Sequence, residues 1–105
     1  MNSVAFGLRS TLASMLLMVI ERFTHDHTAL IRERFTSQGR MLPDDVEYLG
    51  SWIDSASPRC FQLMEAPDAQ SLEPWMRRWD DLMDFEVIPV LSSAEFWAQF
   101  QLQRV

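Results

Sequence analysis

Two almost wholly apolar runs, Met15–Ile20 (MLLMVI) and Phe85–Leu91 (FEVIPVL), constrain the fold of this chain most strongly. A continuous apolar run of this length is typical of a strand that is buried on both faces. The segments between them read helix, strand, strand and helix, so the full order is strand, helix, strand, strand, helix, strand. This order predicts an α+β domain, a split βαβ sandwich in which two helices cover one face of a four-stranded antiparallel sheet.

The apolar character of both sheet faces has a further consequence. Two helices cover only one face, and a domain of 105 residues buries a limited share of its surface on its own. We therefore expect the uncovered face to pair with the same face of a second copy. The sequence thus predicts a homodimer.

The charge balance excludes two classes of partner. The chain carries nine basic and fifteen acidic residues, for a formal net charge of −6. An acidic domain without a cluster of arginines cannot neutralise nucleic-acid phosphates, and it lacks the basic amphipathic face that binds anionic membranes. We expect neither nucleic acid nor a membrane as a partner.

Cysteine usage and the N-terminal segment indicate a cytoplasmic protein. Cys60 is the only cysteine, so no intrachain disulfide can form, which suits a reducing compartment. The apolar run Leu12–Ile20 is too short to span a bilayer, and no small-residue cleavage site follows it. Residues 1–14 are interpreted as a flexible extension ahead of a single domain, residues 15–105; the alternative is an ordered arm that crosses to a partner subunit.

Periodicity and turn signals set the expected bounds of each element. The expected strands are Met15–Phe23, Val46–Asp54, Arg59–Glu65 and Phe85–Leu91. The first helix is expected over His27–Gln38, capped by Asp26 or Thr28 and stopped by Gly39. Its inward-facing residues are expected to be Leu30, Ile31, Arg34 and Phe35. The second helix carries one apolar stripe, formed by Leu72, Trp75, Met76, Trp79 and Met83.

Four local signals refine this outline. Asp68 is a candidate cap for the second helix, and Pro74 predicts a loose first turn there. Pro89 cannot donate to a strand ladder, which places the last strand at a sheet edge. Ser92 and Glu95 have the spacing of a capping box, so they predict a short C-terminal helix whose rings need a surface to cover.

The turn Ser55–Pro58 predicts a hairpin with Asp54 opposite Arg59. If the turn has this length, one face carries the pairs Trp52–Phe61, Gly50–Leu63 and Tyr48–Glu65. The other face then carries the pairs Ile53–Cys60, Ser51–Gln62 and Leu49–Met64. A turn of odd length would change these pairs.

The candidate ligand-lining residues are Tyr48, Trp52, Glu65 and Trp79. A carboxylate beside aromatic rings in a dry cavity can acquire a raised pKa and act as an acid or base. In the alternative interpretation the rings pack in the core and Glu65 reaches solvent at the strand end. Trp75 and Trp79 likewise fit either a pocket between helix and sheet or ordinary core packing.

Motifs for cofactors and metals are weak. Three scattered glycines cannot form a phosphate-binding loop, and the absence of lysine excludes Schiff-base chemistry. Glu21, His25 and His27 would share a face if the first strand extended, but a turn into the helix is favoured, so no metal is assigned. Cys60 is interpreted as a small core residue, and a buried Gln62 must find hydrogen-bond partners. We assign no catalytic residue and no cofactor.

Several stretches resemble a small, mostly bacterial family catalogued only as a domain of unknown function, within the dimeric α/β-barrel superfamily. They are MLLMVIERF (Met15–Phe23), RFTSQGRMLPDDVEYLGSW (Arg34–Trp52), RCFQLMEA (Arg59–Ala66) and WMRRWDDLMDFEVIPVLSSAEFW (Trp75–Trp97). The resemblance implies a ferredoxin-like monomer whose sheets pack face to face in a dimer, and it makes residues 1–14 an extension. Pro74 departs from the family pattern at the helix start. No activity is established for the family, so no catalytic residue can be carried over.

Two functional hypotheses follow. The first is a homodimeric small-molecule-binding or accessory module without chemistry. The second is a small cofactor-free enzyme, monooxygenase- or isomerase-like, that acts on an apolar or aromatic metabolite; the superfamily named above includes such enzymes, but fold-level analogy alone is weak support.

Overall fold

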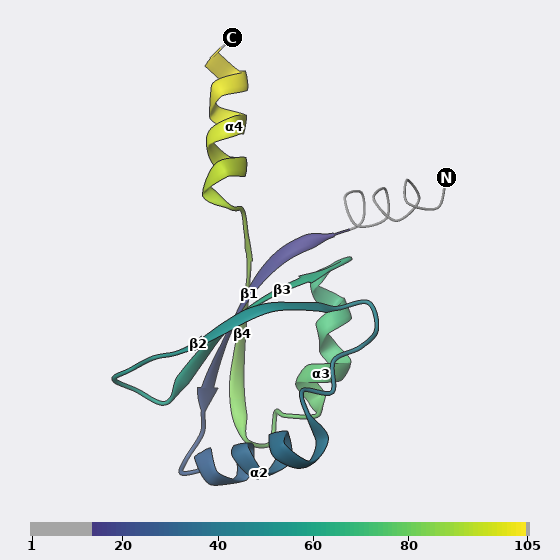
Figure 1. Ribbon diagram of the computed structural model, residues 1–105, viewed down its shortest axis with the longest axis vertical. Coiled ribbons are helices and arrows are strands. Elements are labelled where there is room, and N and C mark those ends of the chain that lie inside the picture. Colours follow the sequence, from purple (N-terminus) through teal and green to yellow (C-terminus); the bar gives the residue numbers. More distant parts are fainter. Residues whose placement is uncertain (1–13, 105) are drawn as a thin grey trace.

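The sheet consists of four antiparallel strands in the order β2-β3-β1-β4 (Figure 1). The computed structural model describes the backbone of residues 14–104 and the side chains as far as residue 100. Its strands are β1 (Met15–Phe23), β2 (Glu47–Ile53), β3 (Arg59–Ala66) and β4 (Met83–Val90). Its helices are α2 (Thr28–Gln38), the 3-10 turn η1 (Ala69–Leu72), α3 (Glu73–Arg77) and α4 (Ser93–Arg104). The predicted α+β class and βαββαβ order are confirmed.

Alternation along β1 separates the two faces of the sheet. Leu17, Val19 and Glu21 are buried on the side of the helices, whereas Leu16 and the other even-numbered residues of β1 point to the opposite side. β1 lies between β3 and β4, which explains its continuous apolar run. Pro89 lies in β4, an edge strand as predicted, where its missing N–H breaks no inner ladder.

The core lies between the helix side of the sheet and the segment Ala69–Trp79. Leu72, Trp75 and Trp79 of the predicted stripe are buried there against Leu17 and Met64. Met83 is also buried, but it belongs to β4, because α3 already ends at Arg77. The prediction of one regular helix through Met83 was therefore wrong.

The local geometry explains this short helix. The carboxylate of Asp68 accepts a hydrogen bond from the Ser71 N–H at 3.0 Å and caps η1 as expected. Pro74 lies in the first turn of α3, where a proline is tolerated because that turn has free N–H groups. The apolar spacing continues past Arg77 because the following turn and strand also face the core.

The first helix differs more from its prediction. α2 begins at Thr28 after His27, with no side-chain cap, and ends at Gly39, whose φ of 70° is the conformation that glycine tolerates. Leu30 and Phe35 remain 49% and 44% exposed, so the expected inward stripe is wrong for them. The reason is placement: α2 lies at one end of the sheet rather than flat across it (Figure 1).

The hairpin register is confirmed near the turn and wrong beyond it. Trp52 pairs with Phe61 and Gly50 pairs with Leu63, as predicted, but a bulge between Tyr48 and Gly50 shifts the rest. A bulge inserts one extra residue and inverts the faces that follow. The remaining pairs therefore become Tyr48–Met64 and Glu47–Glu65, in place of Leu49–Met64 and Tyr48–Glu65.

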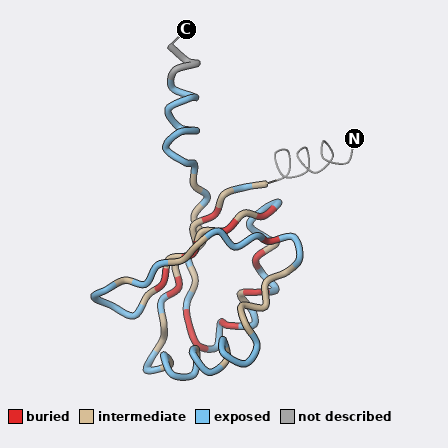
Figure 2. Tube along the Cα trace, in the orientation of Figure 1, coloured by how far each residue is buried: buried red, intermediate tan, exposed pale blue. Residues whose placement is uncertain are grey.

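The C-terminal helix opens with the predicted capping box. The Ser92 hydroxyl accepts from the Glu95 N–H at 3.0 Å, and the Glu95 carboxylate accepts from the Ser92 N–H at 3.1 Å. α4 then stands clear of the sheet, and its side chains over residues 93–100 are exposed (Figure 2). The ring of Trp97 packs edge to face against those of Phe96 and Phe100.

Two further observations concern the chain ends and membranes. The expected flexible extension, residues 1–14, falls outside the described residues except for Ser14. Among the helices of the described part, none combines the length and apolar character needed to cross a membrane.

Candidate functional site

A cavity of about 190 Å³ lies on the helix side of the sheet, near the end of β1 that carries Glu21 and Phe23. Its polar lining comes from Glu21, Arg40, Ser51, Cys60 and Gln62. Its apolar lining comes from Phe23, Ile31, Phe35, Ile53, Trp75, Trp79 and Met83. A few polar groups within an otherwise apolar and aromatic lining are the composition of a small-molecule site.

Glu21 is the central polar group of this cavity. The alternation that buries Leu17 and Val19 also turns Glu21 inward, where it is only 5% exposed. Burial raises the pKa of the Glu21 carboxyl to about 7, although a hydrogen bond from Gln62 and the charge of Arg40 act in the opposite direction. The carboxyl therefore changes charge near neutral pH inside the cavity.

A hydrogen-bonded chain holds this carboxyl in place. Gln62 Nε2 donates to Glu21 Oε2 at 2.6 Å, and Arg40 Nε donates to Gln62 Oε1 at 3.1 Å. The amide of Gln62 thus connects a buried acid to a guanidinium at the cavity edge. This satisfies the expectation that a buried Gln62 finds polar partners.

Aromatic rings fix the position of Arg40. The guanidinium carbon of Arg40 lies 3.7 Å from the centre of the Tyr48 ring, a cation–π contact. The hydroxyl of Tyr48 shares a hydrogen bond with the Ser51 hydroxyl at 2.7 Å. On the opposite side, Trp79 Nε1 donates to the backbone carbonyl of Arg40 at 3.1 Å. Tyr48 therefore acts on the cavity through Arg40, whereas Trp79 both lines the cavity and holds the Arg40 backbone.

Cys60 faces Glu21 directly across β1 and β3. Burial and the neighbouring Glu21 charge raise the pKa of the Cys60 thiol to about 11. A nucleophilic cysteine needs a lowered pKa, so Cys60 stays a neutral thiol. This agrees with its interpretation as a small core residue.

Trp75 borders the cavity with part of its side chain, and its indole N–H is enclosed in the core without a hydrogen-bond partner. Its side chain is only 1% exposed and packs edge to face against Phe85, with ring centres 5.2 Å apart. Among the described residues, its Nε1 is the one buried side-chain donor without a hydrogen-bond acceptor. Buried donors of this kind are rare in folded proteins, since each one forfeits its hydrogen bonds to water.

The structure does not bring the four sequence-predicted residues together. Trp79 lines the cavity, and Tyr48 lies beside it through Arg40. The bulge in β2 turns Tyr48 to the cavity side, while Trp52, 57% exposed, and Glu65 stay on the opposite sheet face. The expected grouping of Tyr48 with Trp52 and Glu65 is therefore wrong, because it assumed an unbroken register.

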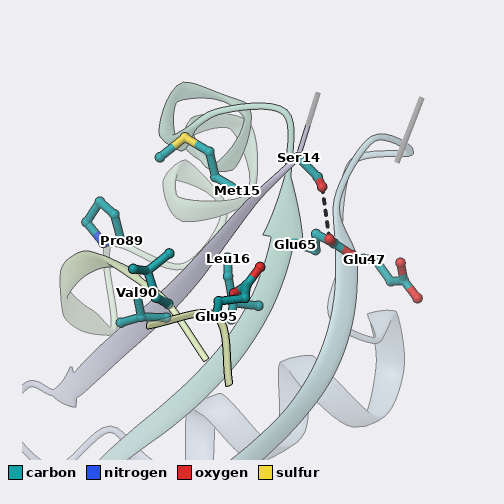
Figure 3. Close-up of a pocket in the computed structure, with 9 residues that line it drawn as sticks. Ser14, Met15, Leu16, Glu47, Glu65, Pro89, Val90 and Glu95 are labelled. Carbon is teal, nitrogen blue, oxygen red and sulfur yellow. Dashed lines mark hydrogen bonds between the residues drawn. The ribbon is translucent and has the colours of Figure 1, made fainter. Parts of the chain in front are cut away.

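Glu65 lies instead at the edge of a larger hollow at the other end of β1 (Figure 3). This hollow of about 810 Å³ is bordered by Ser14, Met15, Leu16, Glu47, Glu65, Pro89, Val90, Leu91 and Glu95. The Ser14 hydroxyl donates to the Glu65 carboxylate at 2.9 Å. Its border includes three carboxylates and no cation, so it offers poorer chemistry for an anionic or apolar ligand than the Glu21 cavity.

The histidines do not extend the strand face that carries Glu21. β1 ends at Phe23, and His25 takes a positive φ of 51° as the chain turns toward α2. His27 Nδ1 lies 3.2 Å from the Thr24 hydroxyl, within this turn. Over the described residues, the structure gathers no set of three potential metal-binding His, Cys, Asp or Glu side chains.

A family model described as a domain of unknown function (DUF3303) matches residues 15–102. No curated protein and no solved structure matches the chain.

The raised pKa of Glu21 predicts a specific dependence of stability on pH. Between about pH 4.5 and about pH 7 the folded state retains a proton that the unfolded state has released, so the free energy of unfolding falls as pH rises through this window. The ionisable groups that face Glu21 are Arg40 and Cys60, and the thiol of Cys60, with its pKa raised to about 11, stays neutral in this window. Glu21→Gln removes the effect. From about pH 4.5 to about pH 7, we expect the free energy of unfolding of the wild type to fall by roughly 3 kcal/mol relative to that of Glu21→Gln, as measured by urea unfolding.

The matched control is Glu33→Gln, which makes the same change at an exposed position of α2. It should leave the fall in the free energy of unfolding between about pH 4.5 and about pH 7 in place. If the free energy of unfolding depends on pH in the same way for Glu21→Gln and the wild type, Glu21 is not a buried acid in solution.

Proposed function

The chain belongs to the DUF3303 family of unknown function, and we propose that it is a homodimeric small-molecule-binding module whose ligand occupies the Glu21 cavity. One observation carries the proposal. The residues that line the cavity include Glu21, whose buried carboxyl has its pKa raised to about 7, and Trp75, whose enclosed N–H has no acceptor among the described residues. Neither the buried carboxyl nor the unpaired N–H stabilises the core, because burying each of them costs free energy.

The free-energy cost of burying the Glu21 carboxyl supports a binding role for this residue. An apolar residue at position 21 would avoid the desolvation that raises the pKa of Glu21. Arg40 and Gln62 reduce that cost but do not cancel it. Perturbed acids in a cleft are typical of binding and catalytic sites, since there the cost is offset by the ligand.

A second function is favoured by the position of the same carboxyl. A general acid or base works best when its pKa is close to the operating pH, and Glu21 meets this condition. The alternative proposal is therefore a small cofactor-free enzyme that moves a proton of an apolar or aromatic metabolite. Loss of turnover in Glu21→Gln, with ligand binding retained, would distinguish this enzyme from a binding module.

The proposed homodimer, of the dimeric α/β-barrel type, rests on the sheet face away from the helices. Apolar side chains of three adjacent strands lie there, namely Leu16, Met18, Ile20, Phe61, Leu63, Ile88 and Val90. Trp52 extends this surface over Gly50 on β2, and Arg22 and Glu86 form an ion pair of 3.1 Å on the same face. A contiguous apolar surface with charged residues beside it is typical of a protein–protein interface. A cytoplasmic location belongs to the same proposal, supported by the single buried thiol of Cys60.

Ligand binding can be tested with toluene as a probe, because the chain carries four tryptophans in distinct places. We expect toluene at millimolar concentration to shift the indole N–H signals of Trp75 and Trp79 in a proton–nitrogen correlation spectrum. Trp52 on the other sheet face and Trp97 on α4 serve as internal controls and should not move. Equal shifts of all four signals, or none at all, would contradict a cavity-specific site.

The dimer can be tested by measuring molar mass in solution at micromolar concentration. We expect the mass of two chains for the wild type and a shift toward one chain for Leu63→Glu, which introduces a charge on the open sheet face. Leu30→Glu makes the same change on exposed α2 and should leave the dimer intact. A monomeric wild type would refute the homodimer.

A further inference from the structure

We propose that the ligand of the Glu21 cavity is a monocarboxylate with an apolar body, and that the guanidinium of Arg40 binds its carboxylate. The inference rests on the proposed binding function and adds the chemical class of the ligand to it.

Arg40 is a half-buried arginine that forms no ion pair with any residue in the described part of the chain. The other half-buried arginines of this part each have a carboxylate partner. Arg34 pairs with Asp81 at 2.8 Å. Arg59 pairs with Asp54, also at 2.8 Å. A guanidinium stays charged and, when half-buried, has lost part of its hydration, so the absence of a counter-ion costs free energy. A bound anion would offset that cost.

The guanidinium of Arg40 has hydrogen-bond donors to spare. Its Nε–H donates to Gln62 Oε1 at 3.1 Å. The ring centres of Tyr48 and Phe35 lie 3.7 Å and 5.2 Å from its central carbon, and the faces of these rings offer it no oxygen. Both Nη groups therefore lack an acceptor among the residues that the structure describes. A carboxylate is the matching ligand, because its two oxygens can accept from two N–H groups of one guanidinium.

Arg40 belongs to the same polar chain as the buried acid of the cavity. Arg40 and Gln62 both line the cavity, and Gln62 Nε2 donates to Glu21 Oε2 at 2.6 Å. The guanidinium is therefore separated from the Glu21 carboxyl by one amide group. Phe35 and Trp79 are part of the apolar lining of the same cavity. A carboxylate held by Arg40 thus leaves the rest of its molecule beside apolar side chains, which favours an apolar body.

The amide of Gln62 keeps the charge of Arg40 available to a ligand. In its place a direct pair between Glu21 and Arg40 would neutralise the guanidinium. Burial raises the pKa of the Glu21 carboxyl to about 7, so below that pH the acid is largely neutral and does not repel an anion. One guanidinium balances one negative charge, which favours a carboxylate over the more highly charged phosphate group.

The backbone holds Arg40 at the cavity in advance of a ligand. Met41 has a φ of 61°, a left-handed conformation that is unfavourable for a residue with a side chain. Trp79 Nε1 donates to the Arg40 carbonyl at 3.1 Å, and Arg78 Nη1 donates to the Met41 carbonyl at 2.6 Å. Strained residues that their surroundings fix in this way are typical of ligand clamps. A residue that is already in position loses less conformational freedom when a ligand binds.

The test compares three probes that share a benzene ring: benzoate, nitrobenzene and benzamidine. Benzoate is an anion, nitrobenzene is its neutral counterpart of the same shape, and benzamidine is a cation. Dissociation constants come from the Trp79 indole signal at about pH 6, where Glu21 is largely protonated. We expect benzoate to bind at least about tenfold more tightly than nitrobenzene, because hydrogen bonds between charged groups are the stronger ones. Benzamidine should bind most weakly, since Arg40 repels it.

A pair of variants assigns the preference to one residue. Arg40→Gln removes the charge, so it should lower the affinity for benzoate to that for nitrobenzene and leave nitrobenzene binding unchanged. Arg32→Gln makes the same change at an exposed position of α2 outside the cavity lining, and should leave the preference for benzoate intact. The comparison of the three probes needs only the wild-type chain, so it stands even if Arg40→Gln fails to fold.

The outcomes separate this inference from the proposed function. Equal affinity for benzoate and nitrobenzene would overturn the carboxylate assignment while leaving a ligand-binding cavity. Tightest binding of benzamidine would overturn it as well, because Glu21 rather than Arg40 would then select the ligand. Tighter binding of phenyl phosphate than of benzoate would contradict the monocarboxylate class. Failure of every probe, toluene included, to shift the Trp79 signal would overturn both the inference and the proposed function.

Discussion

The burial of the Glu21 carboxyl against Gln62 is the interaction on which the rest of the site depends. The 2.6 Å hydrogen bond from Gln62 Nε2 joins the two central strands on the side of the helices. Gln62 in turn accepts from Arg40, which brings the segment after α2 to the cavity edge. Without this chain of polar groups, the Glu21 carboxyl would be left in the core with a solvation cost and no partner.

The sheet separates two tasks between its faces. The helix side holds the packed core around Leu17 and Trp75 and, at its end, the cavity. The opposite side has an apolar surface that no helix of the described residues covers (Figure 1). A dimer formed through that surface would stabilise the sheet while leaving the cavity on the outer side, next to the helices. Binding and assembly could then be altered independently by mutation.

Much of the fold could be predicted from the sequence because its signals are local. The apolar run of β1, the turn Ser55–Pro58 and the capping box at Ser92 each depend on near neighbours, and each is confirmed. Other features depend on distant contacts. The length of α3 and the exposure of Phe35 follow from how each helix meets the sheet, which spacing along the chain does not encode.

The candidate site was harder to predict for two physical reasons. The bulge beside Tyr48 moves this residue to the opposite face from Trp52 and Glu65, and its one sequence signal is Gly50, because an isolated glycine within a strand often marks a bulge. Glu21 did leave a signal, since it is an acid at an inward position of an apolar strand. That signal was interpreted only as a possible metal ligand with the nearby histidines. An inward-facing charge in a central strand needs an explanation of its own.

The most direct test of this account is the titration of the Glu21 carboxyl itself. Its side-chain carboxyl carbon can be followed by NMR from acid to neutral pH and assigned by its absence in Glu21→Gln. We expect a titration midpoint at about 7 for the Glu21 carboxyl, well above the ordinary pKa of 4.5. A midpoint near 4.5 would mean that the carboxyl is hydrated, and the proposed binding site would then lose its central group.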